Sequence, residues 1–301
     1  MLRLGEISFI NAFPLSTEAG LILSNPQISS LEVTCAPPSQ LNQQILTGKL
    51  DISPVSSVFY CRHQDELVLL PAPCIASTSR VKSVLFISPR NWRQDSGHLK
   101  RIWIPDTSET SILLLQWMLS HENLDDIHYF VYEVGQAEGL VFQGEAVLTI
   151  GDEALRLDAK LKEHHHTLNA KVIDLARYWK AQTGLPCVFA VWVARKDWFK
   201  QNKALALQLS QQLNTQAIVF QKNSEHQRQI LKHIETLAPE LHRHIGTNGV
   251  KEYLLTALSY NLNEDAQAAL SILKQICQEY DDKSRKHIEI PVPKRIGLVP
   301  A

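Results

Sequence analysis

The sequence of 301 residues has no long apolar run. None of its apolar stretches reaches the ~18 residues that a membrane-spanning helix needs, so a transmembrane protein is not predicted. The first ten residues, MLRLGEISFI, are broken by Gly5 and Glu6 and lack the small-residue cleavage pattern of a secretory signal. We therefore expect a cytoplasmic protein.

Cysteine and net charge are also scarce. The cysteines are few, scattered and odd in number, and no pair has the CxxC spacing: Cys35, Cys61, Cys74, Cys187 and Cys277. This pattern is typical of reduced, mostly buried thiols. The formal net charge is −1 and the pI is near 6.9, so nothing indicates a nucleic acid or a membrane surface as partner.

Several motifs of cofactor and metal chemistry are missing. The sequence contains no GxGxxG, no GxxxxGK[ST] and no GxSxG, which gives no support to nucleotide binding or to a nucleophile elbow. There is no HExxH, and neither the histidine run at 164–166 nor the pair His242 and His244 has a recognisable third ligand. We therefore predict neither a metal nor a cofactor.

What the sequence does contain is an alternation of strand and helix patterns, typical of an α/β fold with largely parallel sheets. Its length suits two lobes better than one small core. The basic stretch 283–301 contains three prolines and is expected to be an extended tail. The predicted strands lie at 3–10, 51–57, 66–77, 82–88, 101–105, 128–134 and 183–195, a further strand begins the strand–turn–helix segment 145–155, and helices dominate after 195.

Polar side chains follow four of these strands, at Asn11, at Ser56 and Ser57, at 107–111, and at 151–152. Ligands of open α/β sheets bind beyond the carboxyl ends of the strands. Each position alone has an ordinary explanation as turn chemistry or helix capping. Their recurrence at four strand ends favours a ligand site.

Asn11 interrupts the apolar run EISFINAFPL. A buried amide without a partner costs about 1–3 kcal/mol, so we expect a ligand to supply that partner. Pro14 is predicted to end the strand and keep the amide at its end.

The start of the predicted helix after residue 106 is rich in hydroxyls, with Thr107, Ser108 and Thr110. Hydroxyls and the free N–H groups of a helix start bind a carboxylate or a phosphate. Asp106 and Glu109 beside them weigh against a highly charged anion.

Six segments resemble, in this order, the chorismate dehydratase family of menaquinone biosynthesis by the futalosine route, over about residues 1–200. They are GEISFINAFPL, GKLDISPVSSVFY, VKSVLFIS, TSETSILLLQWML, IGDEAL and DLARYWKAQTGLPCVFAVWVAR. The last of them is the most specific. The final hundred residues match only in being helical.

The resemblance implies a type II periplasmic-binding-protein-like fold, in which two lobes close over a central ligand cleft and two chain crossings form the hinge. We expect lobe I to comprise residues 1–87 and 190–301, and lobe II residues 88–189. The apolar runs KSVLFIS and PCVFAVWVA lie where the crossings are expected.

The implied activity is that of a cofactor-independent carbon–oxygen lyase, which removes water from chorismate to give 3-[(1-carboxyvinyl)oxy]benzoate. In this family the enolpyruvyl carboxylate of the substrate is thought to help take the proton. The resemblance makes Asn11 and Ser83 the expected catalytic residues. The expected substrate-binding residues are Ser56, Ser57, Thr107, Ser108, Thr110, Gly151 and Asp152.

The stretch STSRVKS departs from the family. Arg80 and Lys82 stand near the place of a usual Gly-Pro pair, which changes the loop and brings positive charge for a dianion. Two alternatives stay open. One is a 1,4-dihydroxy-6-naphthoate synthase-like enzyme, which is expected to use a histidine base. The other is a non-catalytic cytosolic binder of a small carboxylate ligand.

Overall fold

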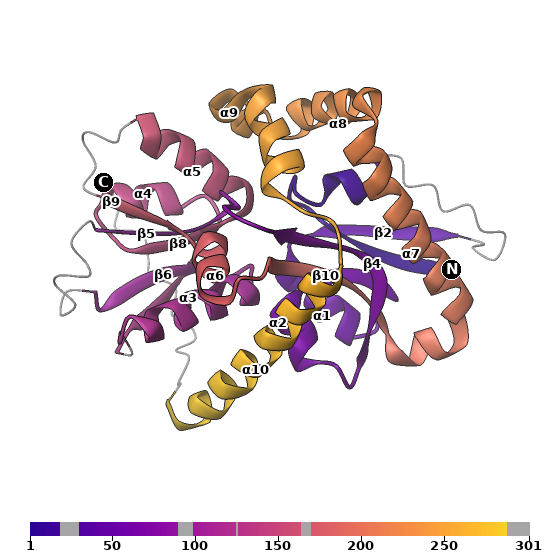
Figure 1. The fold of residues 1–301 in the computed structure, drawn as a ribbon, viewed down its shortest axis with the longest axis horizontal. Coiled ribbons are helices and arrows are strands. Elements are labelled where there is room, and N and C mark those ends of the chain that lie inside the picture. Colours follow the sequence, from indigo (N-terminus) through magenta and orange to yellow (C-terminus); the bar gives the residue numbers. More distant parts are fainter. Residues whose placement is uncertain (19–29, 90–98, 125, 164–169, 288–301) are drawn as a thin grey trace, which may run out of the picture.

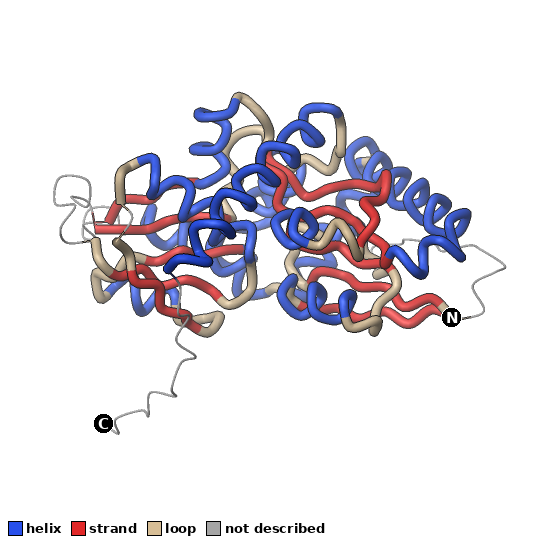
Figure 2. The backbone as a smooth tube through the Cα atoms, turned by 90° about the horizontal axis from the view of Figure 1, so that it is seen from below, coloured by secondary structure: helices blue, strands red, loops and turns tan. Residues whose placement is uncertain are grey.

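The computed structural model describes residues 1–18, 30–89, 99–124, 126–163 and 170–287, and the side chains as far as 281. Within these residues the strands form two five-stranded sheets, which lie side by side (Figure 1). Seen from below, helices flank the strands of both sheets (Figure 2). The predicted α/β class is confirmed. We call the first sheet with its helices lobe I and the second lobe II.

The sheet of lobe I has the order β2-β1-β3-β10-β4. Its strands are β1 (Leu2–Ile7), β2 (Leu31–Ala36), β3 (Ile52–Ser56), β4 (Leu67–Ser77) and β10 (Cys187–Arg195). β1 is parallel to β2 and β3, whereas β10 is antiparallel to both of its neighbours, β3 and β4.

The sheet of lobe II repeats this plan in the order β7-β6-β8-β5-β9. Its strands are β5 (Val84–Pro89), β6 (Arg101–Pro105), β7 (His128–Tyr132), β8 (Val147–Ile150) and β9 (Ala170–Asp174). Here β5 is the single antiparallel strand, inserted between β8 and β9. Both sheets are therefore mixed, with two parallel and two antiparallel pairings each, whereas largely parallel sheets were predicted.

The chain passes between the lobes at residues 78–83 and 184–186. These crossings lie a few residues before the predicted divisions at 87/88 and 189/190. The run KSVLFIS is not shared between the lobes, because its strand β5 pairs with β8 and β9 of lobe II. Residues 84–87 thus belong with lobe II and residues 187–189 with lobe I.

The helices of lobe I that precede the first crossing are short, and those of lobe II alternate with its strands. In chain order these are η1 (Phe13–Leu15), α1 (Pro38–Leu46), α2 (Ser57–Arg62), α3 (Glu109–His121), α4 (Ala137–Phe142), α5 (Gly151–Glu163) and α6 (Leu175–Thr183).

After β10 the chain is helical, as predicted. The elements are α7 (Lys196–Lys222), α8 (Ser224–Leu237), α9 (Pro239–Glu252), the π-helical turn η2 (Tyr253–Ala257) and α10 (Glu264–His287). α7 packs on β4 and α10 on α2, both in lobe I, while α9 packs on α5 of lobe II. The last helices therefore contact both lobes.

Strand β10 shows why a continuous apolar run forms a central strand. Val191, Val193 and Ala194 are completely buried, and Trp192 is 4% exposed. A strand covered on both faces needs apolar side chains at every position rather than at every second one. The run PCVFAVWVA thus provides an interior strand of the lobe I sheet, between β3 and β4.

The predicted tail begins too early. Helix α10 continues to His287, past the predicted boundary at 283. The Oδ1 atom of Asn263 accepts a hydrogen bond from the N–H of Ala266 at 3.0 Å and caps its start. Residues 288–301 lie outside the described residues.

Candidate active site

Asn11 lies in a turn beyond the end of β1. The strand ends at Ile7 rather than at residue 10, and Pro14 stands inside η1 instead of terminating the strand. The prediction that Pro14 ends the strand is wrong, because a proline fits the first turn of a short helix. The carbonyl oxygen of Asn11 accepts a hydrogen bond from the Tyr260 hydroxyl at 2.9 Å.

Ser83 lies in the first crossing between the lobes and is 2% exposed. Its Oγ atom accepts a hydrogen bond from the Tyr253 hydroxyl at 2.8 Å, and its carbonyl oxygen accepts one from the Gly151 N–H at 2.8 Å. Both the backbone and the side chain of Ser83 are therefore held in place.

The loop before Ser83 is organised by Asp174, the N-cap residue of α6. Its carboxylate accepts hydrogen bonds from the N–H groups of Val81 at 3.2 Å and Lys82 at 2.7 Å. Lys82 has a φ of 66°, in the left-handed region that favours glycine. The guanidinium of Arg80 pairs with Asp158 at 2.8 Å and lies 3.7 Å from Asp174, so its charge is engaged inside lobe II.

Gly151 and Asp152 begin α5 and face the turn after β1. Gly151 has a φ of 61°, and a Cβ atom there would lie 3.3 Å from the ring of Phe9. Asp152 is partly buried, and its Oδ1 atom accepts a hydrogen bond from the Ile10 N–H at 3.3 Å. Burial raises the pKa of Asp152 to about 7, and the hydrogen bond from Ile10 lowers it only in part.

Tyr253 links these residues. Burial raises the pKa of Tyr253, and so does the nearby charge of Asp152, whereas hydrogen bonding with the side chains of Ser83 and Asn11 acts in the opposite direction. The hydroxyl of Tyr253 is therefore the common neighbour of three predicted site residues. We call Asn11, Ser83, Asp152 and Tyr253 the Asn11 group.

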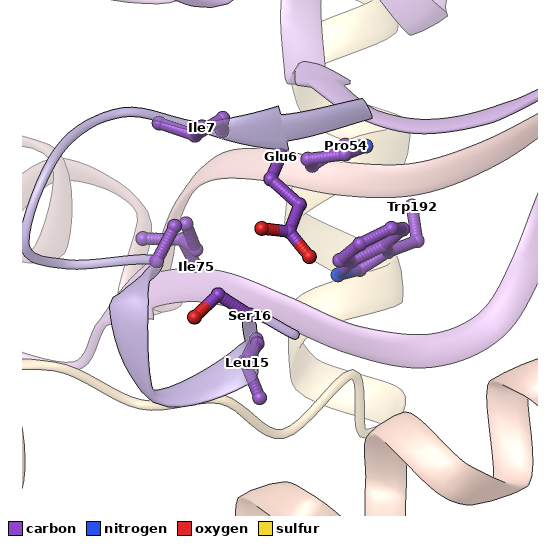
Figure 3. Close-up of a pocket in the computed structure, with 8 residues that line it drawn as sticks. Glu6, Ile7, Leu15, Ser16, Pro54, Ile75 and Trp192 are labelled. Carbon is purple, nitrogen blue, oxygen red and sulfur yellow. The ribbon is translucent and has the colours of Figure 1, made fainter. Parts of the chain in front are cut away.

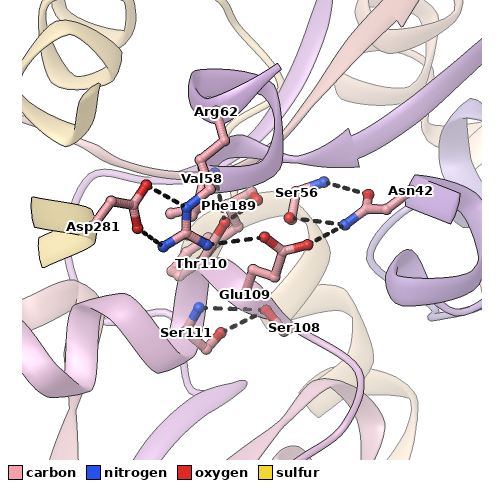
Figure 4. A network of polar contacts seen from close by, with 10 residues as sticks. All are labelled: Asn42, Ser56, Val58, Arg62, Ser108, Glu109, Thr110, Ser111, Phe189 and Asp281. Atoms are coloured by element: carbon pink, nitrogen blue, oxygen red, sulfur yellow. Dashed lines mark hydrogen bonds and ion pairs between the residues drawn. The ribbon is translucent and has the colours of Figure 1, made fainter. Parts of the chain in front are cut away.

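A second polar cluster also joins the lobes (Figure 4). Asn42 of α1 donates hydrogen bonds to the Ser56 Oγ at 3.2 Å and to the Glu109 Oε1 at 3.1 Å. Asn42 Oδ1 accepts a hydrogen bond from the Ser56 N–H at 3.3 Å. Arg62 contacts Glu109 at 3.1 Å and Asp281 at 2.7 Å. We call Asn42, Ser56, Arg62 and Glu109 the Glu109 group.

The hydroxyls at the start of α3 serve the protein itself. Ser108 caps α3, with its Oγ atom 3.4 Å from the Ser111 N–H. The Thr110 Oγ1 atom accepts a hydrogen bond from the Val58 N–H at 3.2 Å and donates one to the Phe189 carbonyl at 3.3 Å. Ser108 and Thr110 therefore have protein partners in the positions where substrate contacts are predicted.

Other polar atoms are buried without a partner. Three of those in the described part of the chain belong to predicted site residues, and two lie in β5 and β8 of lobe II. They are Asn11 Oδ1, Ser57 Oγ, Thr107 Oγ1, Ser88 Oγ and Thr149 Oγ1. Native proteins leave few buried polar atoms unpaired, so the first three indicate positions that a polar ligand can satisfy.

A small pocket in lobe I is a different feature (Figure 3). The carboxylate of Glu6 points into it, near Ile75 and Trp192. Burial raises the pKa of Glu6, and its Oε1 atom accepts a hydrogen bond from the Thr17 N–H at 2.7 Å. None of the predicted site residues lines this pocket, and Glu6 acts there as an anchor for the segment after η1.

The described residues contain neither a cluster of metal-ligating side chains nor a membrane-spanning helix. No three histidine, cysteine or acidic side chains of this part are grouped as metal ligands, and the histidine run 164–166 lies outside it. No helix that the structure describes is both long and apolar enough to cross a membrane. The five cysteines are free thiols, and only Cys35 is exposed.

Five residues of the two groups or their surroundings were not predicted. Tyr253 and Tyr260 lie in the helical last hundred residues, which carry no recognisable motif. Arg62 and Glu109 are ordinary charged residues of helices. Asn42 could have been recognised from the sequence, because this polar residue stands between Leu41 and Ile45 on the buried face of α1.

The chain matches known proteins along most of its length. The model of a family described as menaquinone biosynthesis matches residues 2–279. Chorismate dehydratase from Thermus thermophilus is 34% identical over 180 residues, which cover 57% of this chain. The match spans 64% of that relative, a little less than two thirds of its length.

Solved structures with low sequence identity share the fold. The periplasmic aliphatic sulphonate-binding protein SsuA from Escherichia coli has a TM-score of 0.63 at 13% identity, covering 99% of this chain and 98% of that one. The alkanesulfonate-binding protein SsuA from Xanthomonas axonopodis pv. citri has a TM-score of 0.61 at 15% identity, covering 94% and 93%. The predicted periplasmic-binding-protein-like fold is confirmed, and by its match over residues 2–279 this chain belongs to the menaquinone biosynthesis family.

Proposed function

We propose that this protein is a chorismate dehydratase, which converts chorismate into 3-[(1-carboxyvinyl)oxy]benzoate and water. The observation that carries the proposal is the buried, unpaired Oδ1 atom of Asn11, which lies beside the Tyr253–Ser83 pair. The membership in the menaquinone biosynthesis family and the similarity to the Thermus thermophilus enzyme support it.

The reaction is a carbon–oxygen lyase step that needs no cofactor in this proposal. A base takes the proton from ring carbon C3, and the electron pair of that C–H bond forms the C3–C4 double bond. The C4–O bond breaks, and the hydroxyl leaves as water after it gains a proton. The ring becomes aromatic, so the substrate itself provides the driving force. The protein has to orient the diacid, stabilise developing charge and exclude water.

The Asn11 group has side chains suited to these tasks. The Asn11 amide would hydrogen-bond the substrate near the reacting carbons, and the Ser83 hydroxyl would hold a carboxylate. Asp152 has a pKa of about 7, so a large fraction is protonated near neutral pH and can donate a hydrogen bond to an anionic ligand. An ionised Asp152 would instead repel the dianion.

The unpaired hydroxyls of Ser57 and Thr107 extend the proposed contacts. Ser57 begins α2 in lobe I, and Thr107 follows β6 in lobe II. A substrate with two carboxylates can reach both lobes and hold them together. We also expect the protein to act in the cytoplasm, where free thiols stay reduced.

The test is to mix the purified protein with chorismate and to follow the product by mass spectrometry. We expect a product lighter by one water, turnover lowered by about 10²–10³-fold in Asn11→Ala and a smaller loss in Ser83→Ala. Tyr280→Phe is a matched control, because its hydroxyl bonds to Gln116 and Ser120 away from the Asn11 group. Tight binding of chorismate without turnover would show a binding protein, and no binding would refute both functions.

A further inference from the structure

The side chain of Tyr253 hydrogen-bonds that of Ser83. Its hydroxyl donates to the Ser83 Oγ at 2.8 Å, and both residues are buried, with exposures of 1% and 2%. A phenol is a stronger acid than an aliphatic hydroxyl, which makes Tyr253 the natural donor of this pair. The Ser83 oxygen then accepts, and its own proton is directed away from Tyr253.

The residues that precede Ser83 and Tyr253 also contact each other and so help to hold Tyr253 in place. Lys82, which precedes Ser83, forms an ion pair with Glu252, which precedes Tyr253, at 2.7 Å. Tyr253 also begins the π-helical turn η2, a distortion of the α-helix that is frequent at functional sites. The two segments are thus tied together by neighbouring contacts, although 170 residues separate them in sequence.

The same C-terminal segment also holds Asn11. Tyr260 follows η2 and donates its hydroxyl to the Asn11 carbonyl oxygen at 2.9 Å. The Tyr253 hydroxyl lies beside the Asn11 side chain and within reach of the charge of Asp152. Residues 253–260 therefore support both predicted catalytic residues, although none of the six motifs of the sequence includes them.

We propose that Tyr253 is a positioning residue that orients the Ser83 hydroxyl toward the substrate. This inference rests on the proposed dehydration of chorismate. Because the Ser83 oxygen accepts a hydrogen bond from the phenol, the proton of the Ser83 hydroxyl points away from Tyr253 and toward the substrate. The hydroxyl therefore does not have to rotate when the transition state forms. Tyr253 acts through Ser83 and makes no contact with substrate in this assignment.

The experiment is a double-mutant cycle on the full chain with Tyr253→Phe and Ser83→Ala. We expect Tyr253→Phe to lower kcat by about 10–100-fold through misplacement of Ser83. KM should stay within about threefold, because binding of the ground state is hardly affected. The double variant should be no slower than Ser83→Ala alone. Tyr280→Phe loses a similar hydroxyl-to-serine bond, to Ser120 at 2.6 Å, and should keep the wild-type kcat.

A merely structural role predicts other results. If the loss of kcat in Tyr253→Phe adds in full to that of Ser83→Ala, or if Tyr253→Phe keeps the wild-type kcat, the inference is wrong. If Tyr253→Phe does not fold, fluorotyrosine at position 253 keeps the shape and strengthens the donor. Its kcat should then change in the presence of Ser83 and stay constant in Ser83→Ala. A wild-type chain that does not dehydrate chorismate refutes the proposed function itself, whereas an active wild type with an unaffected Tyr253→Phe refutes only this inference.

Discussion

The two polar groups that join the lobes differ in how completely their atoms are paired. In the Glu109 group, Asn42 uses both its oxygen and its amide nitrogen within the protein, and Glu109 contacts two partners. In the Asn11 group, Asn11 has a buried oxygen without a partner, and Asp152 has a raised pKa. A paired group stabilises the fold, while an incompletely paired group retains binding capacity for a ligand.

The largest effect is expected for Asn11→Ala. Turnover of chorismate should fall by about 10²–10³-fold, the usual cost of losing one positioned hydrogen-bonding group. The midpoint of thermal unfolding should fall only slightly, because the side-chain oxygen of Asn11 makes no hydrogen bond in the protein and only the contact of the side chain with Tyr253 is lost. Steady-state kinetics and calorimetry measure the two quantities. Equal turnover in variant and wild type would show that the unpaired oxygen does not serve the substrate.

Asn42→Ala should show the reverse pattern. The substitution leaves the buried N–H and hydroxyl of Ser56 without their partner, so the free energy of unfolding should fall by about 2–4 kcal/mol. Turnover per folded molecule should stay within about threefold of the wild type. Chemical denaturation gives the stability. A stable Asn42→Ala that has lost its activity would remove the distinction between the two groups.

Asp152→Asn should change how stability depends on pH. The pKa of Asp152 is about 7 in the folded protein, above its ordinary value of 3.8. The protonated carboxyl stabilises the fold fully below about pH 4, and this contribution is lost as the pH rises through about 7. Asparagine has no charge and can still accept the hydrogen bond from Ile10. We therefore expect the free energy of unfolding of the variant to rise relative to that of the wild type by about 1–3 kcal/mol between pH 5 and 8.

Thermal unfolding of both proteins at several pH values is the measurement, with Asp158→Asn as the control. Asp158 is also acidic and buried, but it is paired with Arg80 and Lys162. If the unfolding midpoints of Asp152→Asn and the wild type change with pH in the same way, the pKa at this position is not raised.

Glu109→Gln should have the smallest effect. The ion pair with Arg62 is partly exposed, at 31% and 36% for the two side chains, and such pairs contribute up to about 1 kcal/mol. Glutamine can still accept the hydrogen bond from Asn42. Asp281→Asn is the matched control, because it removes the other partner of Arg62. A loss of more than about 2 kcal/mol in Glu109→Gln would make this contact a principal link between the lobes.

The fold was largely predictable because its signals are local. Strand β6 coincides with the predicted run 101–105, and β4 lies within one residue of 66–77. The errors concern boundaries. A short helix containing Pro14 replaces the end of a strand near Asn11, and α10 extends beyond residue 283. At both places the contacts of the neighbouring elements decide where the element ends.

The candidate site was predictable only in part. Asn11 and Ser83 were named on their motif and are brought to one place through Tyr253. Ser108 and Thr110 were named on the same kind of signal, yet their hydroxyls bond within the protein. A hydroxyl at the start of a helix looks the same in sequence whether it binds a ligand or a neighbouring backbone group.

By itself, the sequence determined the alternation of strands and helices and placed polar side chains at the carboxyl ends of strands. These features depend on residues a few positions apart, which periodicity and turn chemistry reveal. The tertiary structure alone decided which of those side chains are paired. The partners of Ser83 and Asn11 come from 170 and 249 residues along the chain. Such contacts exist only once the C-terminal helices have packed on both lobes, because no local pattern encodes a distance in space.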